Sequence, residues 1–197
     1  PCISFLLLKG RCKGCKSRIP VRDFCTEVIG GAAFIGCVIC YGCGNSGIIS
    51  SRGAVIFAYL GILLTVSLID WDTQMIYDRF HVLILLLGIA ALWLFPEYGI
   101  RDRIIGASVI SIPMLLLSLA IPGAFGGGDM KLMAASGFFL GTAGIVCAMF
   151  FGLLTGGGYG AVMLAKKRLK GNDHFAFGPF LCAGTALTLF VGEWLLS

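Results

Sequence analysis

The chain has 197 residues, of which 58% are hydrophobic and only 13% are charged, with a mean hydropathy of +0.95. Soluble domains carry roughly a quarter charged residues, so this composition excludes an ordinary soluble protein and indicates a polytopic α-helical membrane protein. The formal net charge of +5 gathers in two basic clusters, which indicates membrane topology rather than a nucleic-acid partner.

The chain opens with a polar segment and continues as a series of apolar runs. It begins at Pro1 rather than at a Met and without a signal-peptide pattern, so we expect further residues upstream. We predict a cytoplasmic segment at residues 1–25, incomplete at its N-terminus, and a transmembrane bundle of α-helices at residues 26–197. The predicted passes, about seven and some of them short, are residues 26–42, 53–69, 82–95 and 104–121, two passes within 132–165, and 177–196.

Positive charge orients these passes. The densest basic stretches are residues 9–22 and 166–170, and such stretches favour the cytoplasmic side of the membrane. Both stretches can lie on the cytoplasmic side, because the predicted passes between them are even in number and return the chain to the side where it began. The loops that this order also places in the cytoplasm are residues 70–81 and 123–131.

Several residues lead to more local expectations. Arg101 and Arg103 fall in a predicted outer loop, against the charge rule. The run Gly156–Gly158 suits a close helix crossing or a kink within the sixth pass. His81 and His174 have no partner acid at an informative spacing, and we interpret both as interfacial residues.

Two carboxylates follow apolar runs at corresponding positions. Asp70 comes directly after the run at 53–69, and Asp129 comes shortly after the run at 104–122. An ionisable side chain at a bilayer boundary is costly, so each is a candidate functional residue, and the predicted topology brings both to one membrane face. Paired carboxyls can hydrolyse a peptide, since one carboxylate activates water while a protonated partner polarises the carbonyl.

Three glycines precede the second carboxylate. Without Cβ atoms, Gly126, Gly127 and Gly128 allow an extended substrate or a neighbouring helix to come within van der Waals distance of Asp129. The alternative is a flexible loop with a solvated Asp at a helix N-terminus, where the dipole favours a carboxylate. The corresponding position of Asp70 favours the catalytic interpretation.

Four short motifs occur in order along the chain. The stretch from Gly126 to Leu132 matches the pattern GxGDxKL. The stretch from Ile69 to Asp78 looks like IDxxxxxIPD, with Tyr77 in place of the usual Pro. The stretches Phe177 to Leu181 and Leu8 to Ile19 resemble FGPxL and LrGxCxxCxxxI. Together the motifs resemble those of the type IV prepilin peptidases, a family of GxGD-type intramembrane aspartyl proteases.

The resemblance implies roles for individual residues. Asp70 and Asp129 correspond to the catalytic dyad of the family, which makes residues 26–197 an aspartyl peptidase domain. Asp72 and Asp78 compete for the first catalytic role and are otherwise hydrated loop acids or substrate contacts. Lys131 balances the charge of the dyad, binds lipid phosphate or snorkels at the membrane edge. The residues expected to support the dyad or to contact substrate are therefore Gly126, Gly127, Gly128, Lys131, Asp72 and Asp78.

The resemblance also implies an activity and a location. Members of this family remove the short basic leader from prepilins and pseudopilins of type IV pilus and type II secretion systems, cutting after a Gly. They work at the cytoplasmic face of the bacterial inner membrane. Their proteolysis needs no cofactor, and the resemblance leaves open whether this chain also N-methylates the new N-terminus with S-adenosylmethionine. We expect prepilin or pseudopilin substrates and the lipid bilayer as partners.

Two other functions are compatible with the same acids. A GxGD protease of the preflagellin type shares the dyad but usually lacks a Cys-x-x-Cys segment, which this chain has at Cys12 and Cys15. A polytopic transporter could use Asp70 and Asp129 as an ion or proton site, although such acids are expected near the bilayer midplane.

Two of the cysteines could bind zinc, provided that further cysteines lie upstream. Longer family members complete a four-thiolate site with a second, upstream Cys-x-x-Cys, and such a set suits tetrahedral zinc. Cys12 and Cys15 are therefore zinc ligands only together with upstream cysteines. Cys37, Cys40 and Cys43 share a helix face, and we interpret them as small hydrophobes in an apolar run.

Overall fold

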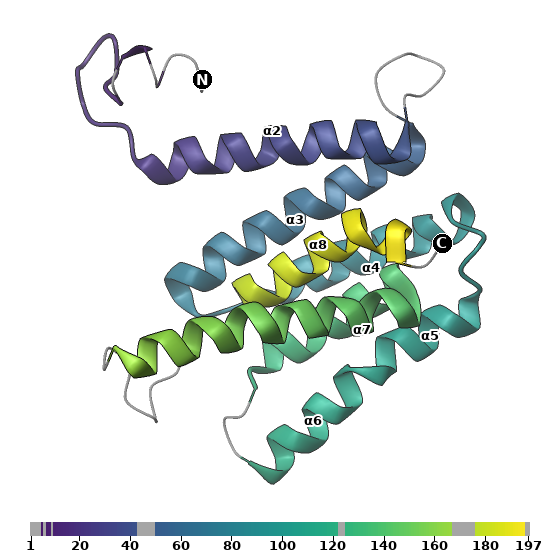
Figure 1. The fold of residues 1–197 in the computed structure, drawn as a ribbon. Coiled ribbons are helices and arrows are strands. Elements are labelled where there is room, and N and C mark those ends of the chain that lie inside the picture. The colour runs from purple at the N-terminus through teal and green to yellow at the C-terminus, as the bar shows by residue number, and fades with distance from the viewer. Residues whose placement is uncertain are drawn as a thin grey trace. The chain divides into compact units, whose positions relative to one another are not determined.

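Figure 1 shows the computed structural model, which describes residues 5, 7, 8, 10–42, 50–121, 125–166 and 176–195. The chain forms two compact units, Pro1–Phe57 and Ala58–Ser197. Within the described residues, β structure is confined to one isolated bridge between Arg11 and Arg18. Most of the predicted basic loop at 166–170, together with Cys43 and His174, lies outside the described residues.

The first unit contains one long apolar helix. Helix α2 (Val21–Tyr41) begins after Pro20 and carries Asp23 in its first turn, where a carboxylate favours the positive end of the helix dipole. The helix ends at Gly42, whose φ of 72° is readily adopted only by glycine. Helix α3 (Ser51–Thr73) starts in this unit and continues into the second.

The second unit is a bundle of apolar helices. It contains α3 from Ala58 onward and, in chain order, α4 (Asp78–Leu94), α5 (Ile100–Val109), α6 (Ser111–Ala120), α7 (Gly127–Ala165) and α8 (Gly178–Leu195). In the described part of the whole chain, four helical stretches are long and apolar enough to cross a bilayer, counting α5 and α6 as one. The predicted polytopic all-α membrane bundle is confirmed.

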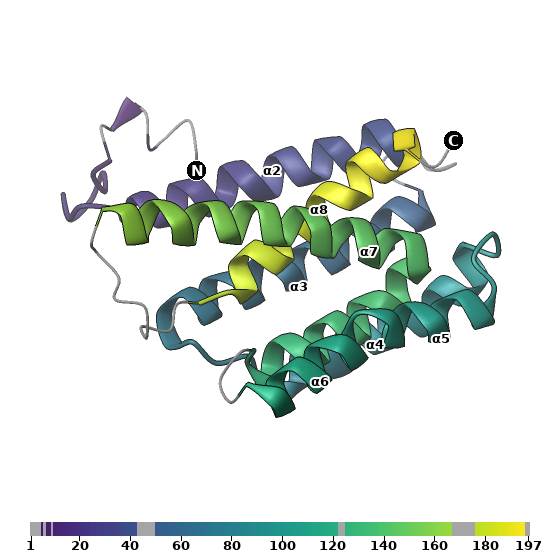
Figure 2. The ribbon, with the colours of Figure 1, turned by 60° about the horizontal axis from the view of Figure 1, so that its bottom comes forward.

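Helix α7 turns back on itself at Gly141. This residue has φ 76° and ψ −179°, a conformation outside the helical region that an L side chain would strain. Met133, before the turn, belongs to the same buried cluster as Ala148, after it, although about 22 Å would separate them in a straight helix. The two halves of α7 run side by side in opposite directions in Figures 1 and 2, as the prediction of two passes requires.

The glycine run later in α7 matches the first of the two alternatives predicted for it. The helix continues through Gly156–Gly158 without a kink, and the break in α7 lies at Gly141. The predicted close crossing is present at Gly156, where a Cβ would come 2.6 Å from a ring carbon of Phe177. A Cβ on Gly157 or Gly158 would meet nothing within 4 Å.

A buried arginine joins the ends of three helices. Arg103 is fully buried, and each of its guanidinium nitrogens donates to backbone carbonyls. The accepting oxygens and their distances are those of Tyr98 (3.3 Å), Phe138 (3.1 Å), Phe139 (2.8 Å), Ala91 (3.0 Å) and Phe95 (3.3 Å). Several of these carbonyls belong to helix C-termini, which lack intrahelical donors. The sequence analysis had placed Arg103 in an outer loop. In the structure it is a buried residue of α5 that binds backbone carbonyls.

Asp102, the residue before Arg103 in α5, binds the turn of α7. The backbone N–H of Thr142 donates to Asp102 Oδ2 at 3.3 Å, and Thr142 Oγ1 donates to the Asp102 carbonyl at 3.0 Å. The α4–α5 connection and the α7 turn thus meet at one end of the second unit. The opposite end collects the C-terminus of α3 and the N-termini of α4, α7 and α8 (Figure 2).

Candidate active site

Asp70 lies in the last helical turn of α3 and is 5% exposed. Its Oδ2 accepts the backbone N–H of Gly178, the first residue of α8, at 3.1 Å. Asp72 is two residues further along and about 200° around the helix, so its side chain is exposed on the other face. The predicted loop at 70–81 therefore begins later than expected, and the helix itself separates the buried acid from its competitor.

Asp129 lies in the first turn of α7 and is 9% exposed. Its carboxylate accepts a hydrogen bond from the Gly126 backbone. The three glycines before Asp129 differ in how closely other atoms pack against them. A Cβ on Gly126 would lie 3.2 Å from Asp129 Oδ2, and one on Gly128 would lie 2.9 Å from Ile76 Cβ, whereas Gly127 faces open space.

The structure brings the two buried carboxylates together. Asp70 and Asp129 are close enough to interact electrostatically, and the buried thiol of Cys182 in α8 lies near both. Ile76, in the α3–α4 connection, contacts both neighbouring glycines, since Cβ atoms on Gly128 and Gly178 would lie 2.9 Å and 3.3 Å from its atoms. Three chain segments thus converge on one pair of acids.

Gly178 and Ile76 are site residues that the sequence analysis did not single out. Both belong to motifs that were matched only as patterns. The signal for Gly178 was its place directly before Pro179 at a helix start, where the free N–H groups of the first turn can bind a carboxylate.

Replacing Gly178 by Ala tests the close contact between the Gly178 backbone and the Asp70 carboxylate. A Cβ at this position would lie 2.6 Å from Asp70 Oδ2, so the carboxyl must move, and a displacement near 1 Å can cost about 100-fold in rate. We expect peptide cleavage by Gly178→Ala to fall by about 10- to 100-fold at matched protein level. Gly157→Ala is the control, because its Cβ enters open space. Wild-type cleavage by Gly178→Ala would contradict this geometry.

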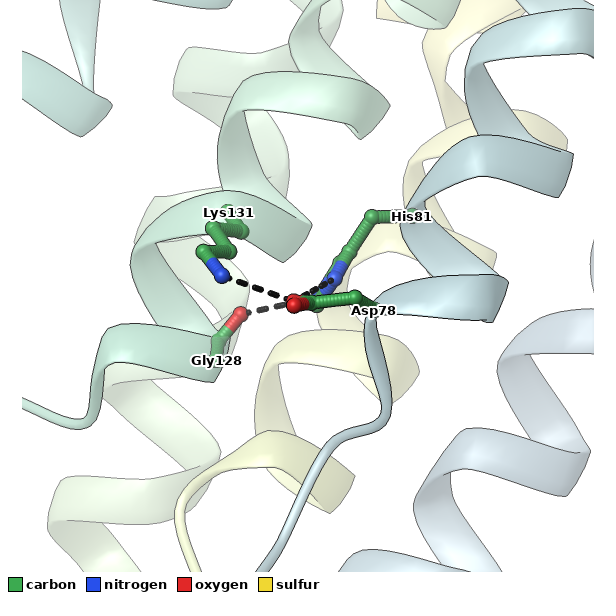
Figure 3. A network of polar contacts seen from close by, with 4 residues as sticks. All are labelled: Asp78, His81, Gly128 and Lys131. Carbon is green, nitrogen blue, oxygen red and sulfur yellow. Dashed lines mark hydrogen bonds and ion pairs between the residues drawn. The ribbon is translucent and has the colours of Figure 1, made fainter.

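A polar network lies beside Asp129 and is shown in Figure 3. Lys131 Nζ donates to Asp78 Oδ1 at 2.7 Å, and this ion pair lowers the pKa of Asp78. His81 Nε2 lies 3.1 Å from the Gly128 carbonyl oxygen, and its Nδ1 lies 3.4 Å from the same Asp78 oxygen. The expectation that His81 has no partner acid is therefore wrong, because one helical turn brings Asp78 beside it.

The α4 start also explains why the substituted motif residue is tolerated. Tyr77 has φ −76° and ψ 137°, values that a proline at this position would also adopt. Asp78 then begins the helix as an exposed N-terminal acid. Tyr77 thus preserves the turn of the matched motif.

Comparison with known proteins identifies the family. The Type IV leader peptidase family matches residues 57–161, which is more than half of the chain and includes Asp70 and Asp129. The chain belongs to this family. The family described as Bacterial Peptidase A24 N-terminal domain matches residues 1–41. The chain is thus a multi-pass membrane peptidase.

Curated members of the family resemble the chain over nearly its whole length. A prepilin leader peptidase/N-methyltransferase of Bacillus subtilis (strain 168) is 29% identical over 197 residues, covering 100% of this chain and 77% of that protein. Proteins of the same name from Burkholderia pseudomallei (strain 1026b) and Neisseria gonorrhoeae are 29% and 30% identical, and the chain covers 62% of each. No solved structure matches the chain at a significant level.

The thiols of the N-terminal segment do not by themselves make up a zinc site. Cys12 is half-buried and Cys15 is exposed. Within the described ranges, no group of three or more His, Cys, Asp or Glu side chains is arranged to hold a metal ion. Two thiols supply half of a tetrahedral set, so zinc still depends on upstream cysteines.

Cys15 is the more exposed thiol of the pair. Hydrogen bonds from Ser17, whose Oγ lies 3.0 Å from the sulfur, and from Cys12 lower the pKa of Cys15 from 9.0 to about 7. We expect Ser17→Ala to slow maleimide modification of Cys15 at pH 7 by about three- to tenfold, because less thiolate is present. Peptide mass spectrometry measures the rate, with exposed Cys25 as the internal control. An unchanged rate would mean that Ser17 does not set the thiolate population.

Proposed function

We propose that this peptidase removes the short basic leader from prepilins and pseudopilins with Asp70 and Asp129 as its catalytic pair. The observation that carries the proposal is the meeting of two buried carboxylates from separate helices at one end of the bundle. Family membership and the names of the relatives support prepilin processing. They do not favour a preflagellin-type protease or a transporter.

The chemistry needs the two carboxyls to share one proton. The ionised carboxyl takes a proton from water as the water oxygen attacks the peptide carbonyl carbon, and the protonated carboxyl donates to the carbonyl oxygen. When the tetrahedral intermediate collapses, the C–N bond breaks and the leaving amine takes up the proton that the first carboxyl removed from water. One hydroxyl of the intermediate returns its proton to the second carboxyl as the carbonyl forms again. Each step uses only protons that the two acids and water supply.

The surroundings of the pair suit this reaction. The Gly178 and Gly126 backbone groups hold the Asp70 and Asp129 carboxylates without adding a competing side chain. Burial lowers the local dielectric, which strengthens the interaction of the acids with charge that develops on the peptide.

Family membership supports the proposed substrate class and location. A basic leader followed by an apolar helix would have its cleavage site at the membrane boundary. Asp70 in the last turn of α3 and Asp129 in the first turn of α7 suit such a position, because both lie near the ends of apolar helices. We propose the cytoplasmic face of the bacterial inner membrane as the side of cleavage, on the charge distribution of the loops.

A second activity is kept apart from proteolysis. The relatives are named N-methyltransferases as well as peptidases, which supports a use of S-adenosylmethionine by the longer proteins. No residue of this chain is assigned to that reaction.

The test is cleavage of a defined substrate by the purified protein in lipid nanodiscs. A prepilin with its leader intact should yield two products, cut after the Gly that ends the leader, and mass spectrometry identifies the new N-terminus. The matched control is the same prepilin with that Gly replaced by a bulky residue. An intact prepilin after incubation with folded, inserted enzyme would refute the proposed function.

A further inference from the structure

His81 is a buried side chain whose ring links two helices next to the candidate dyad. It lies in the first turn of α4 and is 8% exposed. Its Nε2 lies 3.1 Å from the carbonyl oxygen of Gly128, the residue before Asp129 (Figure 3). A carbonyl oxygen only accepts hydrogen bonds, so the proton of a neutral His81 must be on Nε2 for this contact.

The second nitrogen of the ring faces a carboxylate that is already engaged. His81 Nδ1 lies 3.4 Å from Asp78 Oδ1 but makes no hydrogen bond. The same oxygen accepts Lys131 Nζ at 2.7 Å. If the carboxylate were free, it would attract a proton to Nδ1, and the neutral ring would then have none on Nε2. Lys131 therefore favours the tautomer that reaches Gly128.

These contacts hold the start of α7 on both sides of Asp129. Gly128 is linked to His81 through its backbone, and Lys131 is linked to Asp78 through its side chain. Successive helix residues point about 100° apart, so the Asp129 side chain points about 200° away from that of Lys131. It is buried instead, where it interacts with Asp70.

We propose that His81 is a positioning residue that fixes the first turn of α7, and with it the Asp129 carboxyl, through its Nε2–H bond to Gly128. Lys131 and Asp78 hold the ring in the required tautomer. This inference rests on the proposed function of Asp129 and adds a role for side chains outside the candidate catalytic pair. A small displacement of a catalytic carboxyl lowers the rate steeply, so the contact should act on kcat.

The first experiment compares three variants in the prepilin cleavage assay. Gln places an N–H at about the reach of Nε2, Asn is shorter by one methylene, and Leu has no donor. We expect His81→Gln to keep kcat within about threefold of wild type, and His81→Asn and His81→Leu to lose about 10- to 100-fold. KM should stay within about twofold in all three. Equal activity of the Gln and Asn variants, or a change in KM alone, would overturn the proposal.

The second experiment tests the tautomer through Lys131→Met. In the wild-type background this change frees Asp78 to draw the proton to Nδ1, so we expect kcat to fall about three- to tenfold. In the His81→Gln background the same change should have less than about twofold effect, because an amide has no tautomer. Equal losses in both backgrounds would show that Lys131 does not act through His81.

A readout without catalysis separates this inference from the proposed function. Amide hydrogen exchange in residues 127–132 should speed up in His81→Asn and His81→Leu, but not in His81→Gln. If wild-type protein fails to cleave prepilin, the proposed function is wrong and exchange alone decides the inference. Equal exchange rates in all variants would overturn the positioning role whatever the activity.

Discussion

Asp70→Asn and Asp129→Asn should each reduce prepilin leader cleavage by at least about 1,000-fold while the protein still folds and inserts. Asn keeps the shape of the side chain but neither takes a proton from water nor donates an acidic one. Because the two buried acids share a single reaction, the double variant should be little worse than either single one. Initial rates with purified protein in nanodiscs measure the loss.

Asp72→Asn is the matched control for these variants. Asp72 lies in the same helical turn as Asp70 but on the exposed face, so at least about a third of the wild-type activity should remain. Retained cleavage by Asp70→Asn, together with loss in Asp72→Asn, would transfer the first catalytic role to Asp72.

Arg103→Met should lower the free energy of unfolding by about 3–5 kcal/mol, because buried carbonyls lose their charged donor in surroundings that offer no replacement. The affected oxygens include those of Ala91 and Phe95 at the end of α4, and of Phe138 and Phe139 before the turn of α7. Unfolding in mixed detergent micelles, followed by circular dichroism, measures the change.

The control for Arg103 is its exposed neighbour. Arg101→Met removes the same charge from the same helix, and we expect its unfolding free energy to stay within about 0.5 kcal/mol of wild type. Since the Arg103 contacts lie at the end of the bundle away from the acids, residual cleavage by the folded fraction should be near normal. Equal stability of the two variants would mean that the Arg103 bonds contribute nothing net.

The candidate site was predicted from the sequence to the extent that its signals were local. Asp70 and Asp129 each follow an apolar run, and the parity of the runs put them on one face. The sequence separated Asp70 from Asp72 only through the family resemblance, because the end of α3 was placed too early and the two acids seemed to share one loop. Once the helix extends to Thr73, its rotation buries one acid and exposes the other.

The same limit applies to the basic residues. The sequence analysis placed Arg103 in a loop. It left three roles open for Lys131, which were balancing the charge of the dyad, binding lipid phosphate and snorkelling at the membrane edge. In the structure one is fully buried against carbonyls and the other is paired with Asp78. The Arg103 acceptors lie between 5 and 36 residues away along the chain, and the Lys131 acceptor lies 53 residues away.

Membrane class, the order of the passes and the positions of the two acids follow from the sequence alone, since hydropathy, span length and loop charge are properties of short stretches. Only the tertiary structure decided that Gly178 donates to Asp70, that His81 reaches Gly128, and that α7 reverses at Gly141. Such contacts depend on the packing of helices distant in sequence, where a missing Cβ or one buried donor determines how closely two backbones approach.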